Sequence, residues 1–289
     1  MPLPFAKPLA FTQRLPFTKA SACRNDFLII DLAQLDGLMD DQADATSHLH
    51  ELTRRICDRH NGVGADGVEW LSASQTADAD AAIRLINADG SDAEISGNGT
   101  RCVAAYLAAN DSGVRNLRIS TGAGIKQCEL ISRRGKSFEF EMDMGRPQVG
   151  EPFSLKLASA EVTGTPLSMG NPQFVIFVDQ FPANWQALGA EVQRQPVFTE
   201  GVNVDFVRVL SKNEIEVRFF ERGAGETKSS GTGSCASAVA SISAGRAQSP
   251  LTVRAEGGAQ SVRWSQDNAN DNVFLRGPAQ LVCQGEFFV

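Results

Sequence analysis

The chain has 289 residues, of which 42% are hydrophobic and 21% charged, and its formal net charge is -7. This composition is typical of a globular protein, and the length suits one large or two medium domains. An acidic chain lacks the basic surface that nucleic acids and acidic membranes bind, so we expect neither partner. The longest apolar runs, such as residues 174–178, are too short to span a bilayer.

The N-terminal residues contain a short repeat, LPFAK at 3–7 and LPFTK at 15–19. Prolines and basic residues interrupt the apolar core that a secretory signal needs, so we expect a short extension ahead of the first strand. The six cysteines are at least 26 residues apart, which excludes CxxC motifs and predicts free thiols in a reducing, cytoplasmic location. The few histidines argue against a metal site, and we interpret His48 and His50 as surface residues.

Short apolar runs between turn residues predict strands along most of the chain. In chain order they cover residues 26–31, 83–87, 117–121, 138–143, 174–178, 204–210, 214–220, 251–254 and 273–275. Helical patterns cover residues 46–59, 98–109, 185–193 and 231–244. The second and fourth helices are apolar on nearly every side, which predicts that they are buried. The Gly- and Pro-containing segment 144–152 is the best candidate for a linker.

A serine-glycine motif opens both of these buried helices, 134 residues apart. The same shift aligns Asn87 with Glu221 and Ala104 with Ala238. We interpret this as an internal duplication, which predicts an α+β fold of two similar domains, each a curved mixed sheet around a central helix. We expect an N-terminal domain at 1–143 and a C-terminal domain at 144–275, with a strand at 276–289 packing back on the first domain.

The segment GVGADG at 62–67 fits the dinucleotide-binding pattern G-x-G-x-x-G. A helix is predicted before it and a strand after it, whereas that motif requires a strand before and a helix after. We therefore do not interpret it as a nucleotide site.

The two helix starts have a chemistry of their own. A helix N-terminus carries unpaired backbone N–H groups and a partial positive charge, and glycines there let a carboxylate approach closely. Two such ends brought together would bind one carboxylate from both sides, with Ser96 and Ser230 on opposite faces of the adjoining carbon. Inversion of an α-carbon needs this arrangement, because one group removes a proton and the other delivers one.

The segments NADGSDAEISGNGTRC and ERGAGETKSSGTGSC resemble the two signature segments of diaminopimelate epimerases, enzymes of bacterial lysine and cell-wall synthesis. The resemblance continues in FTKASACRNDFLIID, CDRHNGVGADGV, GNPQFVIFVD, VNVDFVRV and GPAQLVCQGE, and covers the chain from about residue 16 onward. It implies conversion of LL- to meso-diaminopimelate without pyridoxal phosphate, metal or other cofactor. It also implies a homodimer and an active site in the cleft between two pseudo-symmetric domains.

The resemblance further implies roles for individual residues. Catalysis would fall to the positions of Ser96 and Ser230, and Glu221 with Arg222 would bind the distal amino-acid end of the substrate, the arginine by a bidentate contact. The remaining substrate-binding positions would be Asn25, Asn87, Asn171 and Asn203, with the backbone at Gly97, Asn98, Gly231 and Thr232 around the α-carboxylate.

The chain departs from the family at both catalytic positions, where the family has cysteine. A thiol at a helix N-terminus ionises near neutral pH, whereas a serine hydroxyl needs a separate base. Cys102 and Cys235 lie within the helices and do not replace the missing thiols. In addition, Gln173 stands where the family often has His, and Arg24 where it usually has Gly; a positive φ at position 24 would strain an arginine.

Three interpretations of the serines remain open. The chain is an epimerase scaffold whose proton-transfer pair is disabled, naturally or deliberately. Alternatively, it has other chemistry, such as a proline or hydroxyproline isomerase or a dehydratase, with Asp92 or Glu226 as the base. As a third interpretation, it is a non-catalytic amino-acid-binding protein. The Glu221-Arg222 pair favours a substrate with a charged distal end over compact proline.

Overall fold

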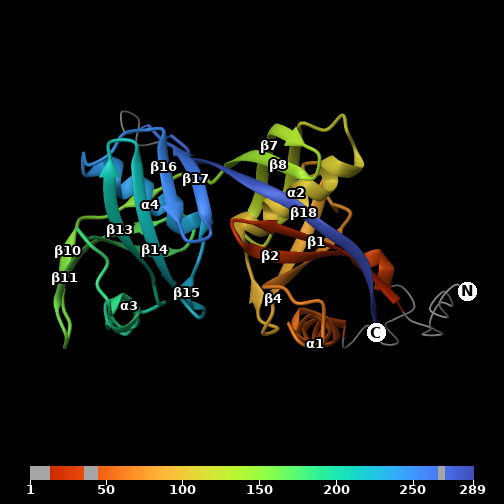
Figure 1. The fold of residues 1–289 in the computed structure, drawn as a ribbon, viewed down its shortest axis with the longest axis horizontal. Helices are drawn as coiled ribbons and strands as arrows, with labels where there is room; N and C mark the ends of the chain where they lie inside the picture. The colour runs from red at the N-terminus through yellow and green to blue at the C-terminus, as the bar shows by residue number, and fades with distance from the viewer. Residues whose placement is uncertain (1–13, 36–44, 266–270) are drawn as a thin grey trace, which may run out of the picture.

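The computed structural model describes residues 14–35, 45–265 and 271–289, so the first LPFAK copy lies outside the described residues. Two lobes lie side by side and are joined by the long strand β18 (Figure 1). The first lobe contains β1 (Arg14–Ala22), β2 (Asn25–Asp31), η2 (Leu32–Leu35), α1 (Ala45–Cys57), β3 (Gly67–Ser72), β4 (Ala81–Asn87), β5 (Asp92–Ala93), α2 (Gly97–Asn110), β6 (Asn116–Thr121), β7 (Gly124–Arg134) and β8 (Ser137–Asp143). The second contains β9 (Gln148–Val149), β10 (Phe153–Lys156), β11 (Glu161–Ser168), β12 (Pro172–Phe177), α3 (Trp185–Gln193), β13 (Asn203–Ser211), β14 (Glu214–Glu221), β15 (Gly225–Thr227), α4 (Gly231–Ser243), β16 (Leu251–Ala255), β17 (Gly258–Arg263) and the start of β18 (Phe274–Phe288).

The strand pairings of the first lobe recur in the second with the 134-residue shift. In the first lobe, β4 pairs with β6 in parallel, with Ala81 opposite Ile119. In the second, β14 pairs with β16 in parallel, with Ile215 opposite Val253. The antiparallel pairs β6–β7 and β16–β17 also correspond, as do the short hairpins β4–β5 and β14–β15. The repeat seen in the sequence is therefore a repeat of backbone pairing.

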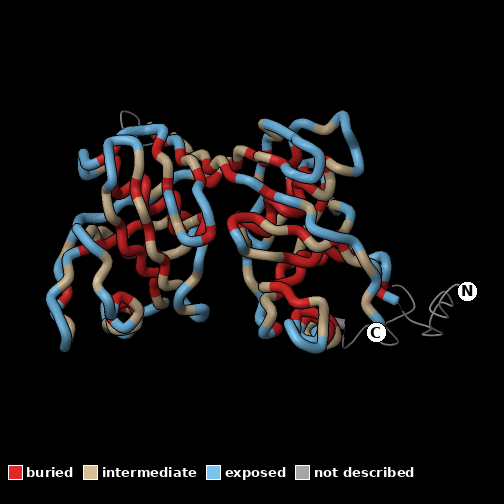
Figure 2. Tube along the Cα trace, in the orientation of Figure 1, coloured by how far each residue is buried: buried red, intermediate tan, exposed pale blue. Residues whose placement is uncertain are grey.

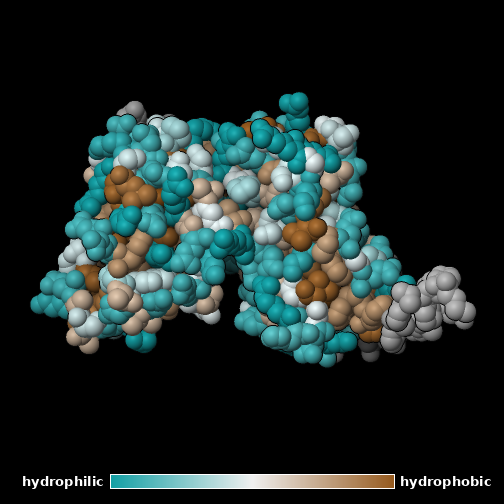
Figure 3. Space-filling view, in the orientation of Figure 1, coloured by the Kyte–Doolittle hydropathy of each residue, from teal (hydrophilic) through white to brown (hydrophobic). Residues whose placement is uncertain are grey.

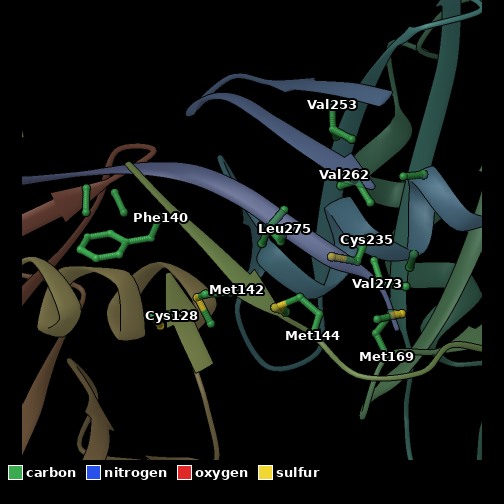
Figure 4. Packing of buried hydrophobic residues seen from close by; sticks show 14 of the residues in the cluster. Cys128, Phe140, Met142, Met144, Met169, Cys235, Val253, Val262, Val273 and Leu275 are labelled. Atoms are coloured by element: carbon green, nitrogen blue, oxygen red, sulfur yellow. The ribbon is translucent and has the colours of Figure 1, made fainter. Parts of the chain in front are cut away.

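Helices α2 and α4 lie inside their lobes, as their apolar composition predicts. Ten of the fourteen α2 residues and eleven of the thirteen α4 residues are buried. Figure 2 shows this buried chain inside each lobe and where the lobes meet. At the junction, Met142 of β8 and Met144, just after that strand, lie near Leu275 of β18 and Cys235 of α4 (Figure 4), all within one apolar cluster. Since burying a side chain of this size contributes about 1.5–3 kcal/mol, apolar contacts hold the lobes together in addition to the backbone.

Several sequence expectations need correction. Strand β1 (residues 14–22) was not predicted: it pairs with both β18 and β2, and alternate residues such as Ala20 and Ala22 are buried. The extension was expected over residues 1–15, and all but the last two of these lie outside the described residues. The expected linker 144–152 contains β9, which pairs with β11. The first helix ends at Cys57, two residues earlier than predicted, and His48 and His50 are partly buried, with His50 Nε2 3.0 Å from Asp92 Oδ2.

The end of the chain crosses from one lobe to the other within a single strand. β18 pairs with β17 of the second lobe, with β8, and then with β1 of the first lobe. Figure 3 shows that a notch separates the lobes along one edge of this face. None of the helices in the described ranges is both long and apolar enough to cross a membrane.

Candidate active site

The two repeated motifs form the starts of α2 and α4, and their serines are the N-caps. Ser96 and Ser230 both have extended backbone, with φ of -123° and -137°. Ser96 Oγ accepts a hydrogen bond from the Gly99 N–H at 3.1 Å, and Ser230 Oγ accepts one from the Gly233 N–H at 3.1 Å. Such a cap stabilises a helix by about 1 kcal/mol. Each hydroxyl is thus fixed at a helix entrance.

The two helix entrances meet. A Cβ added to Gly97 would lie 3.7 Å from the Gly231 Cα, and one added to Gly231 would lie 3.5 Å from the Gly97 Cα. Glycine at both positions lets the two backbones approach closely, so the positive ends of two helix dipoles lie together. This arrangement favours an anion at the point where the helices meet.

Arg101, one turn into α2, adds a buried positive charge to this region. It is fully buried; its Nη2 donates to Asn98 Oδ1 and its Nε donates to Pro278 O at 3.4 Å. Its Nη1 has no hydrogen-bond partner among the described residues, and lies 3.9 Å from where a Gly97 Cβ would be. A buried cation with an unused donor is costly unless an anion binds beside it. Sequence reasoning missed this residue, although it lies within the first signature segment, one helical turn after Gly97.

Asn98 connects the two lobes. Its Nδ2 donates to Ser229 Oγ at 3.1 Å and lies 3.5 Å from Asn25 Oδ1. Asn25 in turn donates to Asp66 Oδ2. The turn before Asn25 has positive φ at Cys23 (52°) and Arg24 (63°), which is the left-handed backbone that was suspected at position 24. A non-glycine residue there costs about 1–2 kcal/mol.

On the second lobe, Gln173 holds two of the expected binding residues. Its Nε2 donates to Asn171 Oδ1 at 2.8 Å and to Thr232 Oγ1 at 3.2 Å, and its side chain is buried. Asn171 also donates to Thr232 Oγ1, at 3.3 Å. Gln173 thereby provides polar contacts at the position where the family often has histidine.

The other expected binding residues lie at or next to strand ends and form hydrogen bonds with nearby backbone and side-chain atoms. Asn203 donates to Pro172 O at 3.1 Å and accepts from the Arg222 backbone N–H at 2.9 Å. The Arg222 guanidinium donates to Glu200 O in an exposed position. Asn87 donates to Ser91 Oγ at 3.1 Å. The structure therefore brings together Asn25 with Asn98, Asn171 with Thr232, and Asn203 with the Arg222 backbone. The side chains of Asn87 and Arg222 contact none of the other expected binding residues.

Glu221, which was expected to bind the distal end of the substrate, is hydrogen-bonded to Ser230. The Ser230 hydroxyl donates to Glu221 Oε1 at 2.7 Å. Burial raises the pKa of the Glu221 carboxyl, and the hydrogen bond from Ser230 partly opposes that increase. A carboxylate in contact with a hydroxyl is the kind of base that a serine needs in order to act in proton transfer.

Sequence reasoning also missed two buried acids, Glu69 on β3 and Asp205 on β13. Both side chains are essentially unexposed, and neither carboxyl has a hydrogen-bond partner within the described part of the chain. Burial raises the pKa of Glu69 to about 8; for Asp205, burial and then the charge of Glu221 raise the pKa. The available signal was an acid inside each of two otherwise apolar strands, VEWL and VDFV.

Solved structures show which proteins share this fold. The structure is similar to a hydroxyproline epimerase from Agrobacterium vitis, solved with bound trans-4-hydroxy-L-proline (TM-score 0.67, 16% identity, covering 96% of this chain and 92% of that one). It is also similar to a phenazine biosynthesis protein of the PhzF family from Bacillus anthracis (TM-score 0.68, 15% identity, covering 96% and 100%). The chain thus has the mixed α+β fold of these proteins.

The sequence comparisons identify the family. The diaminopimelate epimerase family model matches residues 17–150 and 165–282. The diaminopimelate epimerase of Halothermothrix orenii is 34% identical, over 95% of this chain and 98% of the relative. That of Pelotomaculum thermopropionicum is 36% identical, over 94% and 98%. The chain belongs to the diaminopimelate epimerase family.

Proposed function

We propose that the chain binds diaminopimelate in a cleft between its lobes and inverts one of its α-carbons without a cofactor. The observation that carries this proposal is the contact between the starts of α2 and α4, with a serine at each. The α-carboxylate would lie at the two helix ends beside Arg101. There the backbone N–H groups and the guanidinium would stabilise the negative charge that develops as the α-proton leaves.

The Ser230–Glu221 pair supplies proton transfer on one face of the substrate. As the Ser230 oxygen takes the α-proton, its own proton passes to the Glu221 carboxylate at 2.7 Å. Ser96 delivers a proton on the opposite face. A hydroxyl is a far weaker acid than a thiol, so the serine enzyme should be about 10²–10⁴-fold slower than a form with both thiols.

The remaining site assignments belong to the same proposal. Asn25, Asn171 and Asn203 bind the substrate, as does Asn87. The exposed guanidinium of Arg222 binds the distal carboxylate, which favours a diamino diacid over proline. We also propose that the protein works as a homodimer, which the family resemblance supports and sedimentation would test.

The test is α-hydrogen exchange from deuterated water, followed by NMR on LL- and meso-diaminopimelate. The unaltered chain is compared with its Ser96→Cys/Ser230→Cys variant, and binding is measured by calorimetry on both. We expect both forms to bind, with slow exchange by the serine form and much faster exchange by the cysteine form. Binding without any exchange by the serine form would instead support a non-catalytic amino-acid-binding protein. If neither form binds diaminopimelate, the proposed substrate is wrong.

A further inference from the structure

Glu69 and Asp205 occupy equivalent places in the two lobes. Glu69 lies opposite Leu85 in the β3–β4 pair, and Asp205 lies opposite Phe219 in the β13–β14 pair. Leu85 and Phe219 are related by the same 134-residue shift as the two serines. The repeat therefore places one buried acid beside each helix, although Glu69 and Asp205 do not align at that shift in the sequence.

Glu69 points toward α2. Its neighbours Val68 and Trp70 belong to the apolar cluster on the α1 side of the sheet, whereas Leu71 belongs to the cluster that contains α2. Because side chains alternate along a strand, Glu69 shares the α2 side with Leu71.

The Glu69 carboxyl lies at the turn that Ser96 caps. A Cβ added to Gly99 would overlap Glu69 Oε1. This added Cβ would also lie 3.3 Å from the Ser96 Cβ. Glu69 Oε1 therefore lies no more than 5.2 Å from the Ser96 Cβ, although no hydrogen bond joins the carboxyl to the Ser96 hydroxyl in the described structure. In the second lobe, a Cβ added to Gly233 would lie 2.9 Å from Asp205 Oδ1. There, however, Ser230 already has a carboxylate partner in Glu221.

The surroundings of Glu69 favour its protonated form at neutral pH. Both carboxyl oxygens lack a partner in the described ranges, and burial raises the pKa to about 8. Glu69 acts electrostatically on the Cys102 thiol of α2, and so do Arg101 of α2, Cys23 of the β1–β2 turn and Asp26 of β2, which places these charged and titratable groups in one region. The group is thus a buried carboxylic acid that can release a proton near neutral pH.

We propose that Glu69 is the proton source for Ser96, so that Ser96 with Glu69 on one face matches Ser230 with Glu221 on the other. This inference rests on the proposed function. In the delivering step, the Ser96 O–H bond breaks as its proton forms the new C–H bond. The Glu69 carboxyl, after moving into hydrogen-bond distance of Ser96, passes its proton to the Ser96 oxygen. On the opposite face the α-proton passes to Ser230 as the proton of Ser230 passes to Glu221. One proton has then moved from Glu69 to Glu221, and the reverse reaction or exchange with solvent restores it.

Glu69 acts through Ser96 and does not itself contact the substrate, so its effect on position 96 can be tested first without substrate. In a Cys283→Ser background, which removes the exposed native thiol, Ser96→Cys is prepared alone and together with Glu69→Gln. The pKa of the introduced thiol is obtained from its alkylation rate across pH. We expect Glu69→Gln to lower this pKa by about one unit, because the ionised carboxylate no longer opposes the thiolate. Asp205→Asn, the matched change in the other lobe, should leave it unchanged. An equal thiol pKa with and without Glu69 would overturn the inference.

The second test is the pH profile of α-hydrogen exchange on diaminopimelate. The unaltered chain should lose exchange rate above about pH 8 as Glu69 gives up its proton. Glu69→Gln should abolish that limb and lower the rate about 100-fold, with binding changed less than twofold. Glu69→Leu, which suits the apolar surroundings, replaces Glu69→Gln if the amide does not fold. If the exchange rate of both variants still falls above about pH 8, the inference is contradicted. If Glu69 changes the pKa of the introduced thiol but no form binds diaminopimelate, the proposed substrate is wrong and the inference that Glu69 acts on Ser96 stands.

Discussion

The buried carboxyl of Glu69 should make the stability of the protein depend on pH. The ordinary pKa of a glutamate is 4.5, and burial raises that of Glu69 to about 8 in the folded protein. The folded state therefore binds this proton more tightly than the unfolded state. Stability from this group is complete below about pH 4.5 and is lost as pH rises toward about 8. At 1.36 kcal/mol per pKa unit, the loss between pH 5 and pH 8 is about 4 kcal/mol.

Urea unfolding at several pH values measures this dependence. Glu69→Gln removes this titration, so the variant should not lose the stability that the unaltered chain loses as pH rises. From pH 5 to pH 8 the unfolding free energy of the variant should therefore rise by about 4 kcal/mol relative to that of the unaltered chain. Glu129→Gln, which changes an exposed glutamate on β7, is the matched control and should follow the unaltered chain. If Glu69→Gln and the unaltered chain show the same pH dependence, the carboxyl is not buried as described and the reasoning fails.

Three further predictions concern the helix starts. Arg101→Met should weaken diaminopimelate binding by about 1.5–3 kcal/mol in calorimetry, because a charged donor at the carboxylate is lost; unchanged binding would place the anion elsewhere. Gln173→Leu should weaken binding by about 1 kcal/mol through loss of its bonds to Asn171 and Thr232, and an unaffected affinity would mean that those residues do not bind substrate. Gly233→Ala should destabilise the fold by about 1–3 kcal/mol, since its Cβ would lie 2.9 Å from both Asp205 and Phe219; a thermal melt equal to that of the unaltered chain would refute this.

The sequence predicted the parts of the fold that depend on local pattern. The apolar helices at α2 and α4 and the glycine motifs before them were visible because composition and glycine spacing act within a few residues. The 134-residue shift was visible for the same reason, and the backbone pairings follow it. Strand β1 was missed because its polar and basic residues alternate with small ones, and its burial depends on β18, more than 250 residues later in the chain.

The parts of the site that depend on tertiary contact were not predictable. The hydrogen bond between Ser230 and Glu221 forms because the β14–β15 hairpin returns the chain to the start of α4. Glu69 has no local motif, and its position depends on how β3 and α2 pack. Arg101 lies within the first signature segment, one turn after Gly97, but its burial is a tertiary property. The positive φ at Arg24 was anticipated from the family resemblance, since glycine is usual there and arginine has no local reason to adopt it.

The most direct test of the proposed proton transfer is deuterium incorporation at the α-carbon of LL-diaminopimelate, measured with the unaltered chain and with Glu221→Gln. We predict slow incorporation accompanied by formation of the meso isomer, and loss of both when Glu221 is changed, with substrate binding retained. Incorporation that continues at the same rate in Glu221→Gln would contradict the proposal, because the base would then lie elsewhere.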